Sequence, residues 1–452
     1  MIELRRFRGF DSWRRPIPAE RAFYSPNLDR YLEITSERIP NQNLRELFNN
    51  TFANTFDTTA YFEEIDGQPQ TYIITGDIEA MWLRDSTAQI WHYLPLMKDA
   101  PEIQRLIAGL IRKQTQCIRK DPYANAFYND EKVGIHGNDL TVMELGVHER
   151  KWELDSLCYH LRLSISYWNM THDRNPFDQM WLDSVGIILR TMQVQQRKFD
   201  HGPYFFDRIT ENPTDTLSNN GRGAAYAPTG MIASAFRPSD DACQLPFNIP
   251  ANLFALNVLK ELGKVVEELG MGDFEDMIAT LVADISNGIE MSGKVDHEIF
   301  GMIFAYEVDG LGNSVLLDDA NAPSLLSLPS LDAIALGDSI YQSTRSFVLS
   351  PANPYFFQGI AGKGVGSAHT GRNQIWPISL IFQALTSQDK VEIRECLLLL
   401  IESSAKTGLL HESFEADNPY VYSRPWFAWA NSLFGGLMIE LLEKHNELIQ
   451  SI

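Results

Sequence analysis

The stretch PWFAWANSLFGGLMIELL, residues 425–442, is apolar around almost the whole circumference of the helix that it predicts. A helix that is apolar on all sides is buried on most of them. Two further segments share this pattern: MWLRDSTAQIWHYLPL (81–96) and IWPISLIFQAL (375–385). We therefore expect these three segments to form inner helices of a helical protein.

A second class of segments is amphipathic. The spacing i, i+3, i+4, i+7, i+8 of one helix face is followed by Ile103, Leu106, Ile107, Leu110 and Ile111. The same pattern recurs elsewhere, over residues 177–189 and 274–285, and in helices expected to begin near residues 154, 255, 393 and 438. Alternating buried and amphipathic helices are what a closed toroid of inner and outer helices requires. The sequence therefore predicts an all-α toroid.

Strand signals are few. One predicted strand, residues 71–75, follows an Asp-Gly turn, and a second covers residues 299–308. Stretches rich in Gly, Pro, Asn and Asp at 200–250 and 306–330 are expected to be long loops, which in a compact fold usually carry function.

Length and charge set limits on domains and partners. The 452 residues contain 38 Lys and Arg against 59 Asp and Glu, a net charge of −21. So acidic a chain repels phosphate groups, so we expect no nucleic acid and no membrane as a partner, and no obligate protein partner is evident. Four scattered cysteines, with no secretory signal or membrane span found, favour the cytoplasm. With no linker in the chain, we expect an N-terminal segment, residues 1–40, packed on a single domain, residues 41–452.

Polar residues interrupt the first apolar segment. On a helix, Trp82, Asp85 and Ser86 share one stripe, with Arg84 beside it. One interpretation is an internal hydrogen-bond network between Arg84 and Asp85, because buried polar groups need partners. The other is a sugar subsite, in which a carboxylate and a guanidinium bind vicinal hydroxyls beside an indole face.

Two more segments offer carboxylates. In FRPSDDA (236–242), Asp240 and Asp241 follow Arg237. They either cap a helix or, as paired carboxylates, push their pKa values apart so that one stays protonated as a general acid. In HESF (411–414), Glu412 precedes a buried segment that begins with a proline, and it is either an exposed loop carboxylate or a general base holding a water.

Other motifs are less specific. The Gly-rich stretch 362–370 lacks phosphate-loop spacing, and either is a plain flexible loop or brings His369 to a ligand. Oxygen-rich loops at 307–323 do not match the spacing of an EF-hand calcium loop. We expect them to cap a helix that begins at residue 324. The charged run 148–156 lines a rim or forms ion pairs. Zinc, nucleophilic-serine and nicotinamide motifs are missing, which leaves carboxylate-based glycoside hydrolysis without metal or cofactor.

Six long segments between about residues 76 and 437 together resemble glycoside hydrolase family 125: GDIEAMWLRDSTAQIWHYLPL, HERKWELDSLCY, APTGMIASAFRPSDDAC, YEVDGLGNSVLLDDANAPSLLSLPSL, AHTGRNQIWPISLIFQALT and HESFEADNPYVYSRPWFAWANSLFGGL. The resemblance implies an (α/α)6 barrel with long loops and minor β-hairpins. It also implies an inverting, metal-independent exo-α-1,6-mannosidase that needs no cofactor. Its substrate would be a mannose-containing oligosaccharide or an N-glycan fragment.

The same resemblance implies roles for the residues singled out above. Asp240 corresponds to the general acid, with Asp241 as the alternative, and Glu412 to the general base. The expected substrate-binding residues are Trp82, Arg84, Asp85, Ser86, Arg237, Asp241, His369 and Arg424. Another carbohydrate enzyme on the same toroid (a glucoamylase-like hydrolase, a phosphorylase or an epimerase) and a non-catalytic sugar-binding protein are the alternatives.

Overall fold

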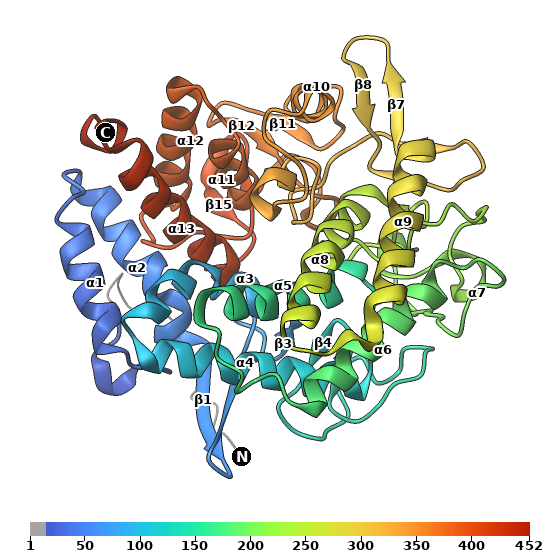
Figure 1. The fold of residues 1–452 in the computed structure, drawn as a ribbon. Helices are drawn as coiled ribbons and strands as arrows, with labels where there is room; N and C mark the ends of the chain where they lie inside the picture. The colour runs from blue at the N-terminus through green and yellow to red at the C-terminus, as the bar shows by residue number, and fades with distance from the viewer. Residues whose placement is uncertain (1–14) are drawn as a thin grey trace.

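A computed structural model describes residues 15–452, and within them helices dominate (Figure 1). The helices are α1 (Pro26–Ser36), α2 (Gln42–Thr58), α3 (Leu83–Ala88), α4 (Pro101–Lys120), α5 (Leu154–Thr171), α6 (Gln179–Gln195), α7 (Ser218–Gly221), α8 (Ile249–Glu268), α9 (Glu275–Ser292), α10 (Ser339–Val348), α11 (Pro377–Leu385), α12 (Lys390–Ser403), α13 (Ala428–Lys444) and α14 (Asn446–Gln450). Short 3-10 helices are η1 (Pro18–Glu20), η2 (Trp91–Lys98), η3 (Pro213–Asp215), η4 (Gly272–Phe274), η5 (Leu328–Leu331) and η6 (Ala368–Thr370).

The helices form two layers. In the inner layer α11 contacts α13, α13 contacts α3, α3 contacts α5 and α5 contacts α8. Outer helices pack on these, with α12 on α11, α2 on α13, α4 and α6 on α5, and α9 on α8. Figure 1 shows these helices arranged around a common centre. The fold is an (α/α)6 barrel, as predicted.

Strands are short and lie in the loops. They are β1 (Ala60–Ile65), β2 (Gln68–Ile73), β3 (Met81–Trp82), β4 (Ala126–Phe127), β5 (Val147–Glu149), β6 (Phe247–Asn248), β7 (Lys294–His297), β8 (Gly301–Phe304), β9 (Glu307–Val308), β10 (Ser314–Val315), β11 (Phe356–Gln358), β12 (Lys363–Val365), β13 (Gln374–Ile375), β14 (Phe414–Glu415) and β15 (Asn418–Tyr422). The sheets they form have two or three strands, ordered β1-β2, β10-β9-β6, β11-β12, β13-β14-β15, β3-β4-β5 and β7-β8.

The predicted hairpin around the Asp-Gly turn is present. Asp66 and Gly67 have positive φ angles of 52° and 76°, and β1 pairs with β2 in an antiparallel register from Ala60↔Ile73 to Ile65↔Gln68. Two positive φ angles in a two-residue loop match the twist of the flanking strands. The strand ends at residue 73 instead of 75. The second predicted strand, 299–308, is instead divided between β8 and β9.

The prediction of one buried helix over residues 81–96 is wrong. Met81 and Trp82 are extended and pair with Phe127 and Ala126 of β4, so the helix begins only at Leu83. It ends at Ala88, and the rest is the 3-10 helix η2, which contains Pro95. Proline removes a backbone donor and clashes with the preceding turn, so an α-helix cannot run through this position. Trp82 therefore does not share a helical stripe with Asp85 and Ser86.

The other two apolar segments do form buried helices. Residues Pro377–Ala384 of α11 are all buried, and so is most of α13. The helix α13 begins at Ala428, after an extended Phe427, so Pro425 precedes it instead of starting it. The long loops at 200–250 and 306–330 contain only short elements.

The segment between α1 and α2 contacts α13 and the residues that follow it. The Arg38 guanidinium donates to the carbonyl of Leu442 at 2.6 Å, and the Asn41 amide donates to the carbonyl of Ile452 at 3.1 Å. Residues 1–14 of the predicted N-terminal segment lie outside the described residues, and the division into residues 1–40 and 41–452 stays a prediction. Within residues 15–452, no helix combines the length and the apolarity needed to cross a membrane.

Candidate active site

A small cavity of about 80 Å³ lies at the N-terminal ends of three inner helices. Trp82, Trp376 and Phe427 occupy the positions immediately before α3, α11 and α13, and all three line it. The other lining residues are Thr75, Ile78, Arg84, Asp85, Pro238, Ser239, Asp240, Asn321, His369, Glu412, Arg424 and Trp429. The helix N-termini favour negative charge here, which suits a site with several carboxylates.

Glu412 is held on one side of the cavity by two donors. The Ser423 hydroxyl donates to its Oε2 at 2.9 Å, and Nη1 of Arg424 lies 3.3 Å from its Oε1. Arg424 in turn forms an ion pair with Asp77, at the start of the loop before β3. The side chain is almost buried, with 9% of its surface exposed, so it faces the cavity and not bulk solvent. The exposed-loop interpretation of this carboxylate does not hold.

Asp240 sits in a tight turn. Its N–H donates to the Arg237 carbonyl at 2.9 Å, and the Arg237 N–H donates to the Asp241 carbonyl at 2.8 Å. Asp240 has a φ of 65°, in the left-handed region that costs energy for a residue with a Cβ and that is found most often where function requires it. This turn sends the Asp240 side chain into the cavity and the Asp241 side chain away from it.

Three donors hold Asp240. Nη2 of Arg84 lies 3.1 Å from its Oδ1, and the Asn125 amide lies 3.3 Å from the same oxygen. Nζ of Lys151 donates to the Asp240 carbonyl at 2.7 Å. The Asp240 side chain is 22% exposed, which is the largest exposed fraction among the four carboxylates around Arg84.

Arg84 is the centre of a buried ionic network. Its Nη1 donates to Glu153 at 2.7 Å and to Asp155 at 3.0 Å, in addition to the Nη2 contact with Asp240. Its Nε lies 3.8 Å from Asp85, beyond hydrogen-bond distance. The sequence left open an internal network or a sugar subsite. The network is present around Arg84, and because Arg84 and Asp85 also line the cavity, the sugar subsite stays a prediction.

The charges around Arg84 spread the carboxyl pKa values apart. Burial tends to raise the pKa of Asp240. The charge of Arg84, the neighbouring Glu153 and the charge of Lys151 outweigh burial, and together they hold that pKa at about 2. Burial raises the pKa of Glu153 well above its ordinary value despite Arg84, and the Asp240 charge raises it further. Burial also raises the pKa of Asp85 to about 6, against the opposing effect of Arg84.

The carboxyl pair of the site therefore differs from the pair that the sequence suggested. Asp241 is buried and accepts hydrogen bonds from the hydroxyls of Thr214 at 2.6 Å and Ser239 at 3.0 Å. The carboxyl that shares donors with Asp240 is that of Glu153, which is distant in sequence and contacts the same Arg84 and Asn125. The predicted pairing of adjacent aspartates is wrong because the turn points them in opposite directions.

The structure brings together seven of the ten predicted site residues and leaves out three. Those lining the cavity are Trp82, Arg84, Asp85, Asp240, His369, Glu412 and Arg424. Ser86 instead donates to the Leu83 carbonyl and accepts from Gln114, so it supports α3. Arg237 is buried in an ion pair with Glu307 at 2.6 Å. Asp241 is the third.

Several residues of the site escaped prediction. Glu153 and Lys151 lie in the charged run 148–156, which also reads as a rim or as ordinary ion pairs. Asn125 carried no sequence signal. Asn321 lines the cavity, and its amide donates to Asp319, from the segment interpreted as a helix cap. Asp318 does accept from the N–H groups of Leu325 and Leu326, but these residues form turns, not a helix.

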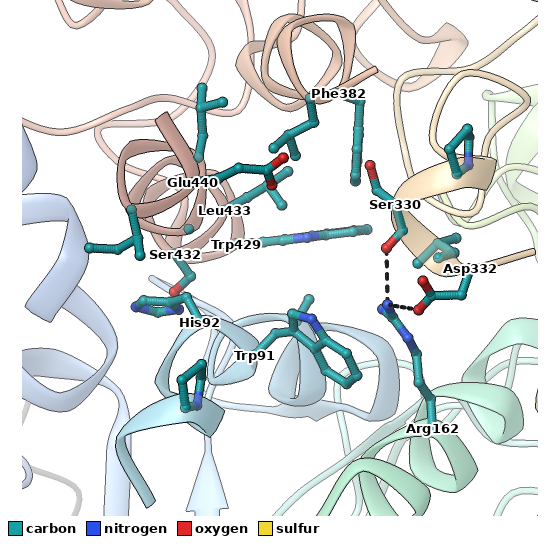
Figure 2. A pocket seen from close by; sticks show the side chains of 18 of the residues that line it. Trp91, His92, Arg162, Ser330, Asp332, Phe382, Trp429, Ser432, Leu433 and Glu440 are labelled. Carbon is teal, nitrogen blue, oxygen red and sulfur yellow. Dashed lines mark hydrogen bonds and ion pairs between the residues drawn. The ribbon is translucent and has the colours of Figure 1, made fainter. Parts of the chain in front are cut away.

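A larger cavity, of about 560 Å³, lies beyond Trp429, which lines both. Figure 2 shows Trp91 and Trp429 on either side of this space. The Arg162 guanidinium stacks 3.7 Å from the Trp91 ring centre and donates to the Ser330 carbonyl at 3.0 Å. The lining of this larger cavity is mostly apolar and includes none of the paired carboxyls around Arg84. The smaller cavity is therefore the candidate active site.

Residues 15–452 contain no group of three or more His, Cys, Asp and Glu side chains placed to hold a metal ion. The four cysteines are unpaired: Cys117, Cys158, Cys243 and Cys396.

Comparison with known proteins places this geometry among carbohydrate enzymes. The sequence profile of the metal-independent α-mannosidases (GH125) matches residues 41–439. The Meiotically up-regulated gene 157 protein of Schizosaccharomyces pombe is 40% identical over 97% of this chain and 90% of its own length.

Solved structures agree with the sequence comparisons. A Streptococcus pneumoniae metal-independent α-mannosidase, in a non-productive complex with α-1,6-mannobiose, is 40% identical and superposes with a TM-score of 0.89 over 94% of this chain and 100% of that one. A bacterial glucoamylase bound to acarbose shares only the fold, with 12% identity and a TM-score of 0.52 over 94% of this chain and 60% of that one.

Proposed function

This chain belongs to glycoside hydrolase family 125, the metal-independent α-mannosidases, and on that premise we propose that it is an inverting exo-α-1,6-mannosidase. Its substrates are mannose-containing oligosaccharides or N-glycan fragments, from which it releases the mannose at the non-reducing end. The α-1,6-mannobiose bound by the Streptococcus pneumoniae relative supports this choice of linkage.

The observation that carries the proposal is that Asp240 and Glu412 line one small cavity from two different loops. Inverting hydrolysis needs two carboxyl groups on opposite sides of the anomeric carbon.

Asp240 is the general acid of the proposed mechanism. Its carboxyl donates a proton to the glycosidic oxygen as the bond from the anomeric carbon to that oxygen breaks. Arg84 and Asn125 hold the carboxyl in position, and the Lys151 contact with its carbonyl fixes the turn that carries it.

Glu412 is the general base. It removes a proton from a water that attacks the anomeric carbon from the opposite face, so the product is β-mannose. Ser423 and Arg424 orient its two oxygens, which leaves the carboxylate one preferred direction for the water.

The terminal mannose is held between aromatic and ionic groups. Trp82 and Trp376 present aromatic surface to the cavity, and Asp85 and Arg424 present groups that bind vicinal hydroxyls. The buried Nε1 of Trp82 has no hydrogen-bond partner within residues 15–452, so it is available to donate to a sugar oxygen.

Proton NMR during hydrolysis of α-1,6-mannobiose tests the proposal in one experiment. We expect free mannose whose first-formed anomer is β, and slower hydrolysis of the α-1,2 and α-1,3 disaccharides. A first-formed α anomer would contradict the inverting mechanism. A need for added phosphate would indicate a phosphorylase, and binding without turnover a non-catalytic sugar-binding protein.

Variants test the two carboxyl roles. Glu412→Gln should lose about 10²–10⁴-fold in kcat while retaining mannobiose binding. Glu415→Gln, three residues further along the same segment and outside the cavity lining, is the matched control and should keep activity. Near-normal turnover by Glu412→Gln would remove Glu412 as the base.

The cytoplasmic location favoured by the sequence stays a prediction.

A further inference from the structure

Glu153 lies directly behind Asp240 and has no part in the mechanism so far. Its side chain is completely buried and does not line the cavity, so it cannot touch the sugar. It accepts from Nη1 of Arg84 at 2.7 Å and from the Ser156 hydroxyl at 2.9 Å. These contacts fix a carboxyl group beside the proposed acid.

Two donors bind Glu153 and Asp240 together. Arg84 contacts Glu153 with Nη1 and Asp240 with Nη2, at 2.7 and 3.1 Å. The Asn125 amide nitrogen bridges the same two side chains, at 3.4 Å from Glu153 and 3.3 Å from Asp240. The same two donors therefore hold the two carboxyls side by side. Two carboxylate ions that share a site repel each other, and a proton on one of them removes that repulsion.

The charges in contact with the pair support a single shared proton. Arg84 lies within ion-pair distance of four carboxyl groups: Asp85, Glu153, Asp155 and Asp240. The second cation near the pair, Lys151, is itself paired with Asp215 and Glu149. Arg208 pairs with these two carboxyls as well, but it also pairs with Asp139, so carboxyls outnumber cations throughout the cluster. A buried group of carboxyls that outnumbers its cations keeps a proton, since each uncompensated charge is costly away from water.

We propose that Glu153 is a positioning residue that stores the proton used by Asp240. In the free enzyme Glu153 is the neutral partner and donates a hydrogen bond to the Asp240 carboxylate. This inference rests on the proposed function, because it explains how an acid held in its charged form by Arg84 and Lys151 can still protonate a glycosidic oxygen.

The steps balance as follows. With a mannoside bound, the proton passes from Glu153 to Asp240, and Glu153 becomes the carboxylate. Asp240 gives that proton to the glycosidic oxygen as the carbon–oxygen bond breaks, while Glu412 takes a proton from the attacking water. After the products leave, Glu412 releases its proton to solvent and the pair takes one back. The net reaction is the addition of one water across one glycosidic bond.

Other ionisable groups face Glu153 and Asp240 and set the pH range over which this pair keeps its shared proton. Asp85 and Asp155 share Arg84 with it, from α3 and α5, and Glu149 and His148 approach from β5. His369, from η6, faces Asp240 from across the cavity and favours its charged form. Burial lowers the pKa of His148 to about 4, so it stays neutral near pH 7 and does not compete for the proton.

The test compares Glu153→Gln with Asp155→Asn on two substrates. Both carboxyls are fully buried and both accept from Nη1 of Arg84, so Asp155→Asn is the matched control. The substrates are α-1,6-mannobiose, whose leaving group needs a proton, and α-mannosyl fluoride, whose leaving group does not. Circular dichroism and mannose binding verify that each variant is folded.

We expect Glu153→Gln to lose about 10²-fold in kcat on mannobiose and to keep its rate on the fluoride within a few-fold. We expect the same pattern for Asp240→Asn, because it removes the proposed acid itself. We also expect the alkaline limb of its kcat/KM profile to move. Asp155→Asn should change both substrates alike. Equal losses on both substrates for Glu153→Gln, or none on mannobiose, would overturn the proposal.

Two outcomes separate this proposal from the function beneath it. If the wild-type enzyme does not hydrolyse mannobiose, or if Asp240→Asn lacks the leaving-group pattern, the proposed function fails. If both behave as expected and Glu153→Gln does not, only the role of Glu153 fails. Should Glu153→Gln not fold, infrared spectra of the wild-type enzyme decide: a neutral buried carboxyl band that Asp240→Asn alters supports the shared proton, and its absence refutes it.

Discussion

Asp85 is expected to lower the free energy of unfolding of the protein, while its charge contributes to binding at the candidate active site. Its carboxyl is 7% exposed and lies 3.8 Å from the nearest nitrogen of Arg84, so it loses hydration without gaining a close ion pair. Burial raises its pKa to about 6 from 3.8. We predict that Asp85→Asn makes the protein more stable at pH 7 and less able to bind mannose.

The size of the effect follows from the difference between the two pKa values. A raised carboxyl pKa means that the folded state holds the proton more tightly than the unfolded state. Stability is therefore lost as the pH rises from about 4 to about 6, and it stays lost above that. At 1.36 kcal/mol for each pH unit between 3.8 and about 6, the loss at pH 7 is about 3 kcal/mol. With an unfolding entropy of about 2.1 cal/mol/K per residue over 452 residues, this corresponds to about 3 °C in Tm.

Thermal unfolding followed by circular dichroism between pH 4 and pH 8 measures this effect. Asp85→Asn should match the wild type near pH 4, where the carboxyl is neutral in the folded state, and exceed it by about 3 °C at pH 7. Mannose affinity measured by calorimetry should fall about tenfold or more, because a charged hydrogen-bond acceptor is lost. A variant that is no more stable than the wild type at pH 7, or an offset that does not change with pH, would refute the reasoning.

Three further predictions concern binding, packing and metal. Trp82→Phe should raise KM for mannobiose about fivefold with little change in kcat, since it removes one donor to the bound sugar; a fall in kcat alone would contradict this. Gly366→Ala should destabilise the protein by about 1–3 kcal/mol in thermal unfolding, because the added Cβ would lie 2.0 Å from the Gln374 carbonyl. Gly337→Ala, with nothing within 4 Å of its Cβ, is the control and should be near neutral. Extensive dialysis against EDTA should leave the rate of mannobiose hydrolysis unchanged, and a loss restored by a divalent cation would contradict a metal-independent mechanism.

The elements that the sequence predicts correctly are those decided by local composition. Residues 375–385 and 425–442 are apolar on every side, and no arrangement of this chain could expose them at low cost. Residues 81–96 have the same composition, but Met81 and Trp82 pair with a strand more than forty residues away. Such a long-range pairing leaves no trace in the periodicity of the segment itself.

The site shows the same division. The segments around Asp240 and Glu412 stand out because carboxyls adjoin Arg, Pro and aromatic residues. Glu153 could not be singled out, since a glutamate in a run of charged residues usually lies in solvent. Only the fold brings it under Asp240 and removes the water around it.

The contact between α2 and α13, which are far apart in the sequence, has a consequence for biogenesis. The last long helix, α13, packs against α2, and the final residue contacts Asn41. Translation therefore produces α13 after the other inner helices described above, and Arg424 can reach Asp77 only after the 347 positions that separate them have been made. The nascent protein has to keep an open arc of apolar inner helices protected from aggregation until then. A change within α13 acts on this closing step, and so on the yield of folded protein.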